Sequence, residues 1–166
     1  MSEVIHHYDI GQWVVHCRYG VGQIKKTENI PLHGDAQTKE LCFQVQTRDG
    51  IFWFPVEPQD NPRVRPVITK RKLVTSLETL KEPPEDMDAH HNELRLRINE
   101  AQTDVSMKTS VRLIRDLSAR NAIKRLNILE KRTLRRHTDR LVREWALCME
   151  MDETKAQTEF DILLQE

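Results

Sequence analysis

The densest group of residues suited to chemistry is a run of cations between residues 131 and 143. One helical face carries Arg132, Arg136, Arg140 and Arg143, with Lys131 and Arg135 beside it. A guanidinium group binds phosphate through two parallel hydrogen bonds, so arginines on one ridge favour contacts to a nucleic-acid backbone. Such contacts position a protein on DNA without reading base sequence. The alternative is an ordinary solvated helix face that happens to be basic.

A second candidate is the aromatic run Ile51-Phe52-Trp53-Phe54, which Pro55 ends. In a strand, Ile51 and Trp53 point to one side and the two phenylalanines to the other. A small barrel has one interior, so one of these pairs must face outward or lie beneath another segment. Exposed aromatics beside a cation such as Arg48 favour a protein interface. Burial under another part of the chain is the alternative.

Other residue combinations do not assemble a catalytic or cofactor site. His16 and Cys17 are neighbours in a predicted strand and point to opposite faces. The pair His90-His91 has no companion cysteine or carboxylate at metal-ligand spacing. Gly20-Val-Gly22 is too short for a phosphate-cradling loop and no helix follows it. We therefore expect neither an enzyme nor a bound metal or cofactor.

Composition describes a polar protein whose charges are segregated. The 166 residues are 38% hydrophobic and 31% charged, and 26 basic residues balance 26 acidic ones. Between Arg95 and Arg143 there are fourteen Lys/Arg and five Asp/Glu, whereas residues 144–166 hold seven acids and one lysine. A basic block of this kind favours a polyanionic partner. The three cysteines, the absence of a long apolar run and the polar N-terminal residues predict a soluble protein of a reducing, cytoplasmic compartment.

The first half of the chain has the pattern of a small β domain. Strands are expected over residues 13–18, 21–28, 41–46, 51–54 and 63–68, with a polar loop around Pro31, Gly34 and Asp35. Gly20 and Gly22 suit a tight turn, and Asp49-Gly50 is a strong hairpin signal. Five short strands without an intervening helix indicate an SH3- or Tudor-like barrel over residues 1–80.

The second half has the pattern of a helical bundle. Pro83-Pro84 and neighbouring acids predict a linker over residues 81–89. Helical spacing then recurs after residue 90, in stripes around Ile98, Ile114, Leu141 and Phe160. Asn127 with Glu130 forms a capping-box pattern, and Asp152 suits a helix N-cap. The sequence therefore predicts an α+β protein, with a compact four- to five-helix domain over residues 90–166.

Several segments resemble a known family. Residues 10–24 and 51–57 resemble the polymerase-interacting domain shared by CarD-type bacterial transcription regulators and the transcription-repair coupling factor. The segments 113–117, 129–134 and 152–156 resemble the helical domain of CarD proteins in order and spacing. The coupling factor carries only the barrel, so the combination with a helical domain is specific to the CarD type. The likeness covers residues 10–164.

The resemblance implies two binding surfaces. The barrel is expected to bind the RNA polymerase β subunit through Lys25, Lys26, Arg48, Phe52 and Trp53. The helical domain is expected to contact promoter DNA at the upstream edge of the transcription bubble through His90, His91, Arg95, Lys131, Arg132, Arg135, Arg136 and Arg140. CarD proteins place a wedging tryptophan where this chain has His91, so the wedge is expected to be weaker, pH-sensitive or absent.

Three functions remain open at this point. The first is a nucleoid-associated transcription regulator that modulates open-complex stability. The second is an adaptor that binds polymerase and recruits another protein through its helical domain without wedging. The third is a stand-alone nucleic-acid-binding protein with salt-dependent affinity. We expect a monomer without membrane association, although an unpaired barrel edge leaves self-association open.

Overall fold

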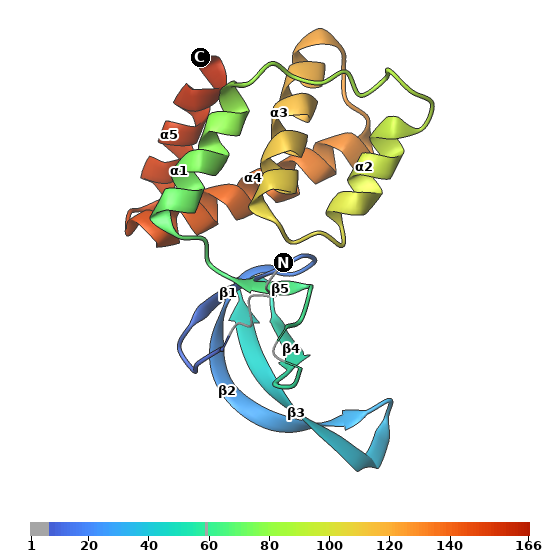
Figure 1. Ribbon diagram of the computed structural model, residues 1–166, viewed down its shortest axis with the longest axis vertical. Coiled ribbons are helices and arrows are strands. Elements are labelled where there is room, and N and C mark those ends of the chain that lie inside the picture. Colours follow the sequence, from blue (N-terminus) through green and yellow to red (C-terminus); the bar gives the residue numbers. More distant parts are fainter. Residues whose placement is uncertain (1–6, 59) are drawn as a thin grey trace. The chain divides into compact units, whose positions relative to one another are not determined.

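The chain folds into two units, one built of strands and one of helices (Figure 1). The computed structural model describes residues 7–58 and 60–166. The first unit ends at Pro66 and the second begins at Val67. Because strands and helices segregate along the chain, the predicted α+β class is confirmed.

The first unit is a five-stranded antiparallel sheet with strand order β4-β3-β2-β1-β5. Its strands are β1 (Trp13–His16), β2 (Gly20–Leu32), β3 (Asp35–Thr47), β4 (Ile51–Pro55) and β5 (Val64–Pro66). The two outermost strands share one core, because Phe54 of β4 and Val64 of β5 belong to the same buried cluster. The Tyr8 hydroxyl donates to the Val64 carbonyl at 3.2 Å. The sheet therefore curls about one interior, as a small barrel requires.

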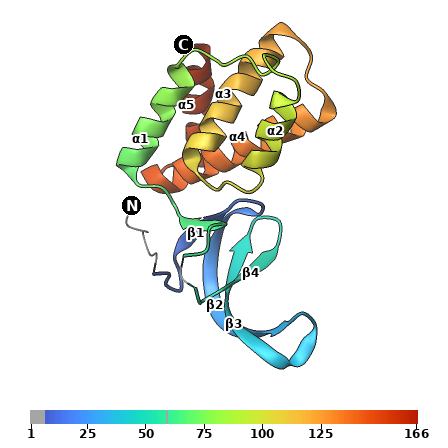
Figure 2. The ribbon, with the colours of Figure 1, turned by 45° about the vertical axis from the view of Figure 1, so that its right-hand side comes forward.

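Strands β2 and β3 extend as a long, bent two-stranded ribbon (Figures 1 and 2). The predicted loop around Pro31, Gly34 and Asp35 is therefore wrong. His33 and Gly34 form a two-residue turn with φ values of 50° and 78°, which match the twist of a hairpin. Pro31 is tolerated because the ladder shifts register next to it. The segment looks like a loop in the sequence because residues 35–39 are exposed on both faces of the ribbon.

The two glycines of the predicted β1–β2 turn have different roles. Gly20 has a φ of +77°, as a turn residue should. Gly22 lies inside β2, where a Cβ atom would come within 2.6 Å of Val45 Cγ1 and 3.0 Å of the Gln46 carbonyl oxygen. Gly22 is therefore required by the close approach of β2 and β3 rather than by its backbone angles.

The second unit consists of five α-helices and one 3-10 turn. They are α1 (Lys70–Glu78), η1 (Thr79–Lys81), α2 (Glu93–Ala101), α3 (Met107–Ile123), α4 (Ile128–Met149) and α5 (Glu153–Gln165). Helix α3 packs against α1, α2 and α4. The predicted capping box of Asn127 with Glu130 and the N-cap at Asp152 are both present. No helix among the described residues is long and apolar enough to cross a bilayer.

Helix α1 was not predicted, and it moves the boundary between the units. Thr69 caps it by accepting the Lys72 backbone N–H at 3.4 Å. Leu73 and Leu80 are buried in a cluster with α3, α4 and α5, and Leu77 packs against that cluster. The helical unit therefore begins at Val67, and the barrel does not extend to residue 80. Leu73, Leu77 and Leu80 have helical spacing, but the β-branched residues Val74, Thr75 and Thr79 between them are typical of strands and obscured it.

The acidic segment predicted as a linker, residues 81–89, packs within the helical unit. Met87 is buried in a cluster with residues of α2 and α3. The Glu85 backbone N–H donates to Asp116 Oδ1 at 2.9 Å, and the Glu85 carboxylate accepts from Arg112 at 3.0 Å. Prolines prevent this segment from becoming a helix, but they do not prevent it from packing. It is a strap on α3, and we call residues 82–88 the acidic strap.

We expect Gly22→Ala to destabilise the barrel by about 1–3 kcal/mol, because a methyl group has no room beside Val45 and the Gln46 backbone. Amide hydrogen exchange measured by NMR at Ile24 and Val45 would report the local unfolding free energy. Gly50→Ala is the matched control, since a Cβ at Gly50 meets nothing within 4 Å. Equal effects of the two substitutions would contradict the packing role of Gly22.

Candidate interaction surfaces

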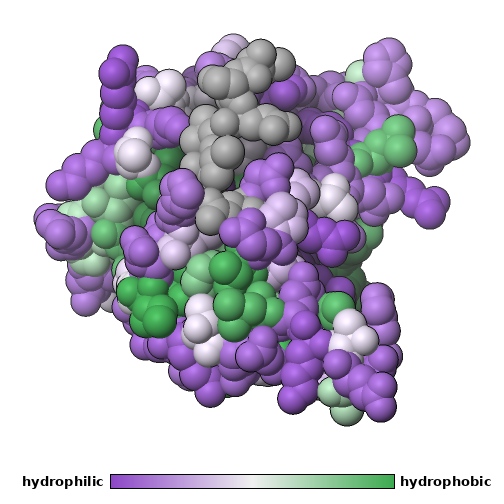
Figure 3. Space-filling model, turned by 60° about the horizontal axis from the view of Figure 1, so that its bottom comes forward, coloured by the Kyte–Doolittle hydropathy of each residue, from purple (hydrophilic) through white to green (hydrophobic). Residues whose placement is uncertain are grey.

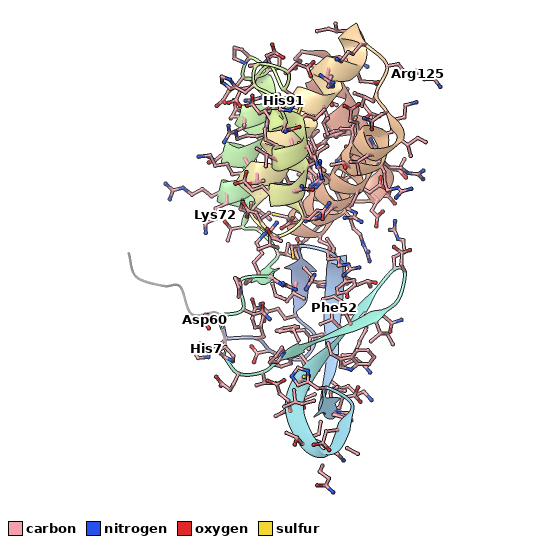
Figure 4. The ribbon with its side chains drawn as sticks, turned by 90° about the vertical axis from the view of Figure 1, so that its right-hand side faces the viewer. His7, Phe52, Asp60, Lys72, His91 and Arg125 are labelled. Atoms are coloured by element: carbon pink, nitrogen blue, oxygen red, sulfur yellow. The ribbon has the colours of Figure 1, made fainter. Side chains whose placement is uncertain are left out.

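The aromatic run of β4 divides between the core and the surface. Phe52, labelled in Figure 4, and Phe54 are 4% and 3% exposed. The Phe52 ring stacks on that of Tyr19, with their centroids 5.1 Å apart. Ile51 and Trp53 remain 48% and 44% exposed. The expected partner contact by Phe52 has to be corrected, because its ring lies inside the sheet. Because successive side chains of a strand point to opposite faces, Trp53 points outward instead.

Trp53 is held in place on the outer face by Glu28. The indole Nε1–H of Trp53 donates to Glu28 Oε1 at 2.5 Å, and Lys26 Nζ lies 3.1 Å from Glu28 Oε2. Gln44, which is registered between Lys26 and Trp53 in the sheet, also donates to Glu28 at 3.4 Å. Hydrogen bonds from Lys26 and then Trp53 hold the pKa of Glu28 below its ordinary value.

The cations predicted for this surface lie at different places on the sheet. Lys26 is exposed in the cluster around Glu28. Lys25 is exposed at a register shift of β2, and its Nζ donates to Gln23 Oε1 at 2.7 Å. Arg48 is exposed in the turn between β3 and β4. Lys26 and Trp53 therefore share a contact with the same carboxylate, that of Glu28.

Strand β4 also exposes backbone groups. Among the described residues, no strand pairs with its outer edge. The Gly50 carbonyl accepts from Thr47 at 2.8 Å, and the Val56 N–H donates to Leu41 at 3.0 Å, so both point toward β3. Because backbone direction alternates along a strand, the groups of Ile51 and Trp53 point away from β3. This edge is open to pairing with another strand.

Helix α4 presents a shorter basic ridge than its sequence predicts. Its exposed cations are Lys131, Arg132, Arg135 and Arg136. Arg143 is half-buried, with Nε 3.9 Å from Glu153 Oε1 of α5. Arg135 Nε lies 3.8 Å from Asp139 on the same helix, a weak exposed pair. We call the four exposed cations the α4 ridge.

The DNA contact expected of Arg140 has to be corrected, since Arg140 is only 7% exposed. Helix α4 packs against both α3 and α5, so its buried face is broad. That face includes His137, Leu141 and Glu144 as well as Arg140. A helical wheel of α4 shows one apolar stripe. It does not show that a second side of the helix is also buried, because the residues on that side are polar. Phosphate contact by Arg140 would require the bundle to open.

His90, His91 and Arg95 are exposed at the start of α2. His91 is labelled in Figure 4. The two histidines lie in a turn that ends at Asn92, whose φ is 65°. All three side chains are therefore accessible on the surface of the helical unit.

Ion pairs connect the end of the acidic strap, two residues before this histidine turn, with the start of α4. The Asp88 carboxylate accepts from Arg120 and, at 3.0 Å, from Lys124, both at the end of α3. Arg120 Nε is also 3.2 Å from Glu130 Oε1, in the first turn of α4. The pKa of Asp88 is lowered, mainly by its hydrogen bond from Arg120. The acidic strap and the start of α4 are thus joined through α3.

Sequence analysis missed Glu28 and Arg120, the residues that hold these surfaces together. Glu28 acts on Trp53, which lies 25 residues later, and Arg120 acts on Asp88, 32 residues earlier. Residues so far apart in the sequence form no local pattern that would identify them as partners. The strand register would have identified Glu28, because Lys26, Gln44 and Trp53 are aligned across three strands.

The described side chains offer little for catalysis. Within residues 7–58 and 60–166, no three His, Cys, Asp or Glu side chains cluster so as to hold a metal ion. Ser110 Oγ and His137 Nδ1 lie 2.7 Å apart, but both residues are buried. Burial, with the charges of Arg140 and Arg136, lowers the pKa of His137 to about 3. This pair is a neutral hydrogen bond of the core.

We expect the emission of Trp53 to change on acidification with a midpoint below pH 4.5, the ordinary pKa of glutamate. The folded-state pKa of Glu28 is lowered, so its hydrogen bond stabilises the fold above the unfolded-state pKa. That contribution is lost as the pH falls through the folded-state pKa. The measurement is the fluorescence difference between the protein and its Trp53→Phe variant. Glu28→Gln should abolish the transition, and a midpoint at or above 4.5 would contradict the contact.

Comparison with known proteins identifies the helical unit. The family model described as the CarD C-terminal domain matches residues 75–161, from within α1 to near the end of α5. A search of curated proteins found no match. The matched segment covers more than half of the chain and contains the acidic strap, the histidine turn and the α4 ridge. The chain therefore belongs to the CarD family, a family of transcription regulators rather than enzymes.

Proposed function

We propose that this protein regulates transcription initiation by holding RNA polymerase and promoter DNA at the same time. Its sheet binds the polymerase β subunit, and its helical unit contacts DNA at the upstream edge of the transcription bubble. The observation that carries the proposal is the open β4 edge beside an exposed, oriented Trp53 in a CarD-family chain. The protein would act as a monomer at the nucleoid, in the cytoplasm, without a cofactor.

The polymerase contact rests on three features of β4. Ile51 and Trp53 direct their backbone groups away from β3, so a strand of the partner can add to the sheet. The Trp53 indole is fixed by Glu28 and loses little rotamer freedom on binding. Lys26 lies in the same cluster and supplies charge for an acidic partner. Phe52 supports this surface from inside the sheet.

The DNA contact rests on exposed cations of the helical unit. The α4 ridge offers four of them, and within residues 7–58 and 60–166 the ion pair that the structure gives for this ridge joins Arg135 to Asp139. The histidine turn and Arg95 extend the surface along α2. These groups suit phosphate and sugar contacts, which give orientation without base specificity. Because the sheet tethers the protein to polymerase, the effective DNA concentration is high and weak contacts suffice.

The regulatory effect then follows from differential affinity. A protein that binds the open promoter complex more tightly than the closed one shifts the equilibrium toward opening. A wedge at the edge of the bubble would supply that difference by offsetting the cost of unstacking, which is a few kcal/mol per base step. His91 occupies the wedge position with a small polar ring. We therefore propose weaker bubble stabilisation than a tryptophan would give.

The alternative is an adaptor that binds polymerase and recruits another protein without wedging. One observation favours it: the only tryptophan of the helical unit, Trp145, is 6% exposed and packs in the core. No aromatic wedge is then available on that unit's surface near His91. In the adaptor, polymerase binding persists while open-complex lifetime is unaffected.

The polymerase contact is tested with Trp53→Ala. We expect this change to weaken binding to isolated polymerase β by at least tenfold, because it removes an exposed aromatic anchor at the interface. Binding would be measured by biolayer interferometry. The control is Leu41→Ala, because Leu41 is an exposed side chain on β3. Trp13→Ala would not serve, since Trp13 is half-buried. Unaltered binding by Trp53→Ala would exclude the proposed surface.

The DNA contact is tested by the lifetime of open promoter complexes formed with bacterial RNA polymerase. We expect Arg132→Ala/Arg136→Ala to shorten the lifetime gained from the protein and to weaken its salt dependence, since two phosphate contacts are lost. Arg71→Ala/Lys72→Ala removes two exposed cations of α1 and should have no such effect. His91→Trp should lengthen the lifetime. No response to any of these variants, with β binding intact, would favour the adaptor.

A further inference from the structure

The connection between α3 and α4 exposes large aliphatic side chains. Ile123, the last residue of α3, is 86% exposed, and Ile128 and Leu129, the first two residues of α4, are 77% and 49% exposed. All three lie within seven consecutive residues. Single exposed aliphatic residues are common, but several together mark an interaction site. We call residues 123–131 the α3–α4 corner.

The corner is rigid, so these side chains are not exposed by fraying. The capping box fixes the start of α4, with Glu130 Oε2 accepting the Asn127 N–H at 2.7 Å and Asn127 Oδ1 accepting the Glu130 N–H at 2.9 Å. Glu130 is itself buried and paired with Arg120 of α3. Leu126, only 3% exposed, anchors the connecting segment. A surface held in this way binds without first having to become ordered.

Part of the corner forms a shallow, open groove with a basic rim. This groove, of about 660 Å³, is lined by residues 125–129 and Lys131, so it includes Ile128 and Leu129. Ile123 lies outside it, in a separate pocket whose lining includes Glu85, Asp86 and Asp88 of the acidic strap. Arg125 extends from the connection between the two helices (Figure 4). The structure gives no ion pair for Arg125 or Lys131 within the described residues, whereas Lys124 is paired with Asp88. The only acid of the corner, Glu130, is buried.

We propose that the α3–α4 corner is a docking groove for an acidic amphipathic segment of a partner protein. Aliphatic residues of the segment would pack against Ile128 and Leu129, and its carboxylates would meet Arg125 and Lys131. This combination is how an amphipathic helix binds in a groove. Contact with a duplex backbone is a weaker explanation, because phosphates need the cations but not the two exposed aliphatic side chains between them. The proposal does not depend on the proposed function.

The test uses a synthetic, fluorescein-labelled helical peptide with leucines on one face and glutamates on the other. A second peptide has the same composition, scrambled so that no apolar face forms. Fluorescence anisotropy gives the affinities of the full-length protein, and methyl NMR follows the isoleucine signals. We expect the patterned peptide to bind at least tenfold more tightly than the scrambled one and to shift the methyl signal of Ile128.

Substitutions then locate the site. Ile128→Ser should weaken binding of the patterned peptide roughly tenfold, because it removes one aliphatic anchor. Arg125→Glu should weaken it further in low salt. Leu96→Ser is the matched control, since Leu96 is 64% exposed on α2 of the same unit and lies outside the corner. Circular dichroism would verify that each variant is folded.

Several results would overturn the proposal. Equal affinity for the two peptides would mean that charge alone is recognised. Equal losses in Ile128→Ser and Leu96→Ser would place the site elsewhere. If labelled duplex DNA shifts the Ile128 methyl signal and loses affinity in Ile128→Ser, the groove binds nucleic acid instead. Self-association in sedimentation experiments that Ile128→Ser abolishes would make a second copy the occupant.

Discussion

The buried carboxylate of Asp116 receives hydrogen bonds from three directions. Arg97 of α2 donates at 2.6 Å, Arg115 beside it on α3 at 2.7 Å, and the Glu85 backbone N–H of the acidic strap at 2.9 Å. Burial alone would raise the pKa of Asp116, but these donors outweigh it and hold the pKa below its ordinary value. The strap and α2 are thereby fixed on α3. The position of His90 and His91 between them depends on this one carboxylate.

Different interactions hold the exposed residues of the two units in place. In the sheet, alternation along β4 puts the phenylalanines into the core and leaves Trp53 outside, where Glu28 orients it. In the helical unit, ion pairs between elements hold the surface residues in place. Arg120 of α3, for example, pairs both with Asp88 of the acidic strap and with Glu130 of α4. Side-chain packing along β4 positions the surface of the sheet, whereas ion pairs position the surface of the helical unit. Salt should therefore affect the helical surface more than the sheet.

Local patterns in the sequence predicted most of the elements but not how they pack. The capping box of α4 was predictable because both its residues lie within four positions. Helix α1 was missed because it is short and β-branched residues separate its leucines, and the ribbon was missed because its residues face solvent on both sides. Arg140 and Phe52 were misplaced for a related reason, since burial of one face depends on which neighbour covers it. Which neighbour covers a given face is a property of the tertiary structure, and local sequence patterns do not contain it.

The long β2–β3 ribbon constrains how chains of this type can vary in length. Between its two register shifts, each residue of β2 from Lys26 to Pro31 is matched with one of β3, from Gln44 back to Lys39. A single residue inserted in this matched stretch would leave one strand out of step, so that its side chains would change faces from that point to the core. Two inserted residues, one in each strand, would preserve the pairing. Length differences within the matched stretch among related proteins should therefore occur in even steps.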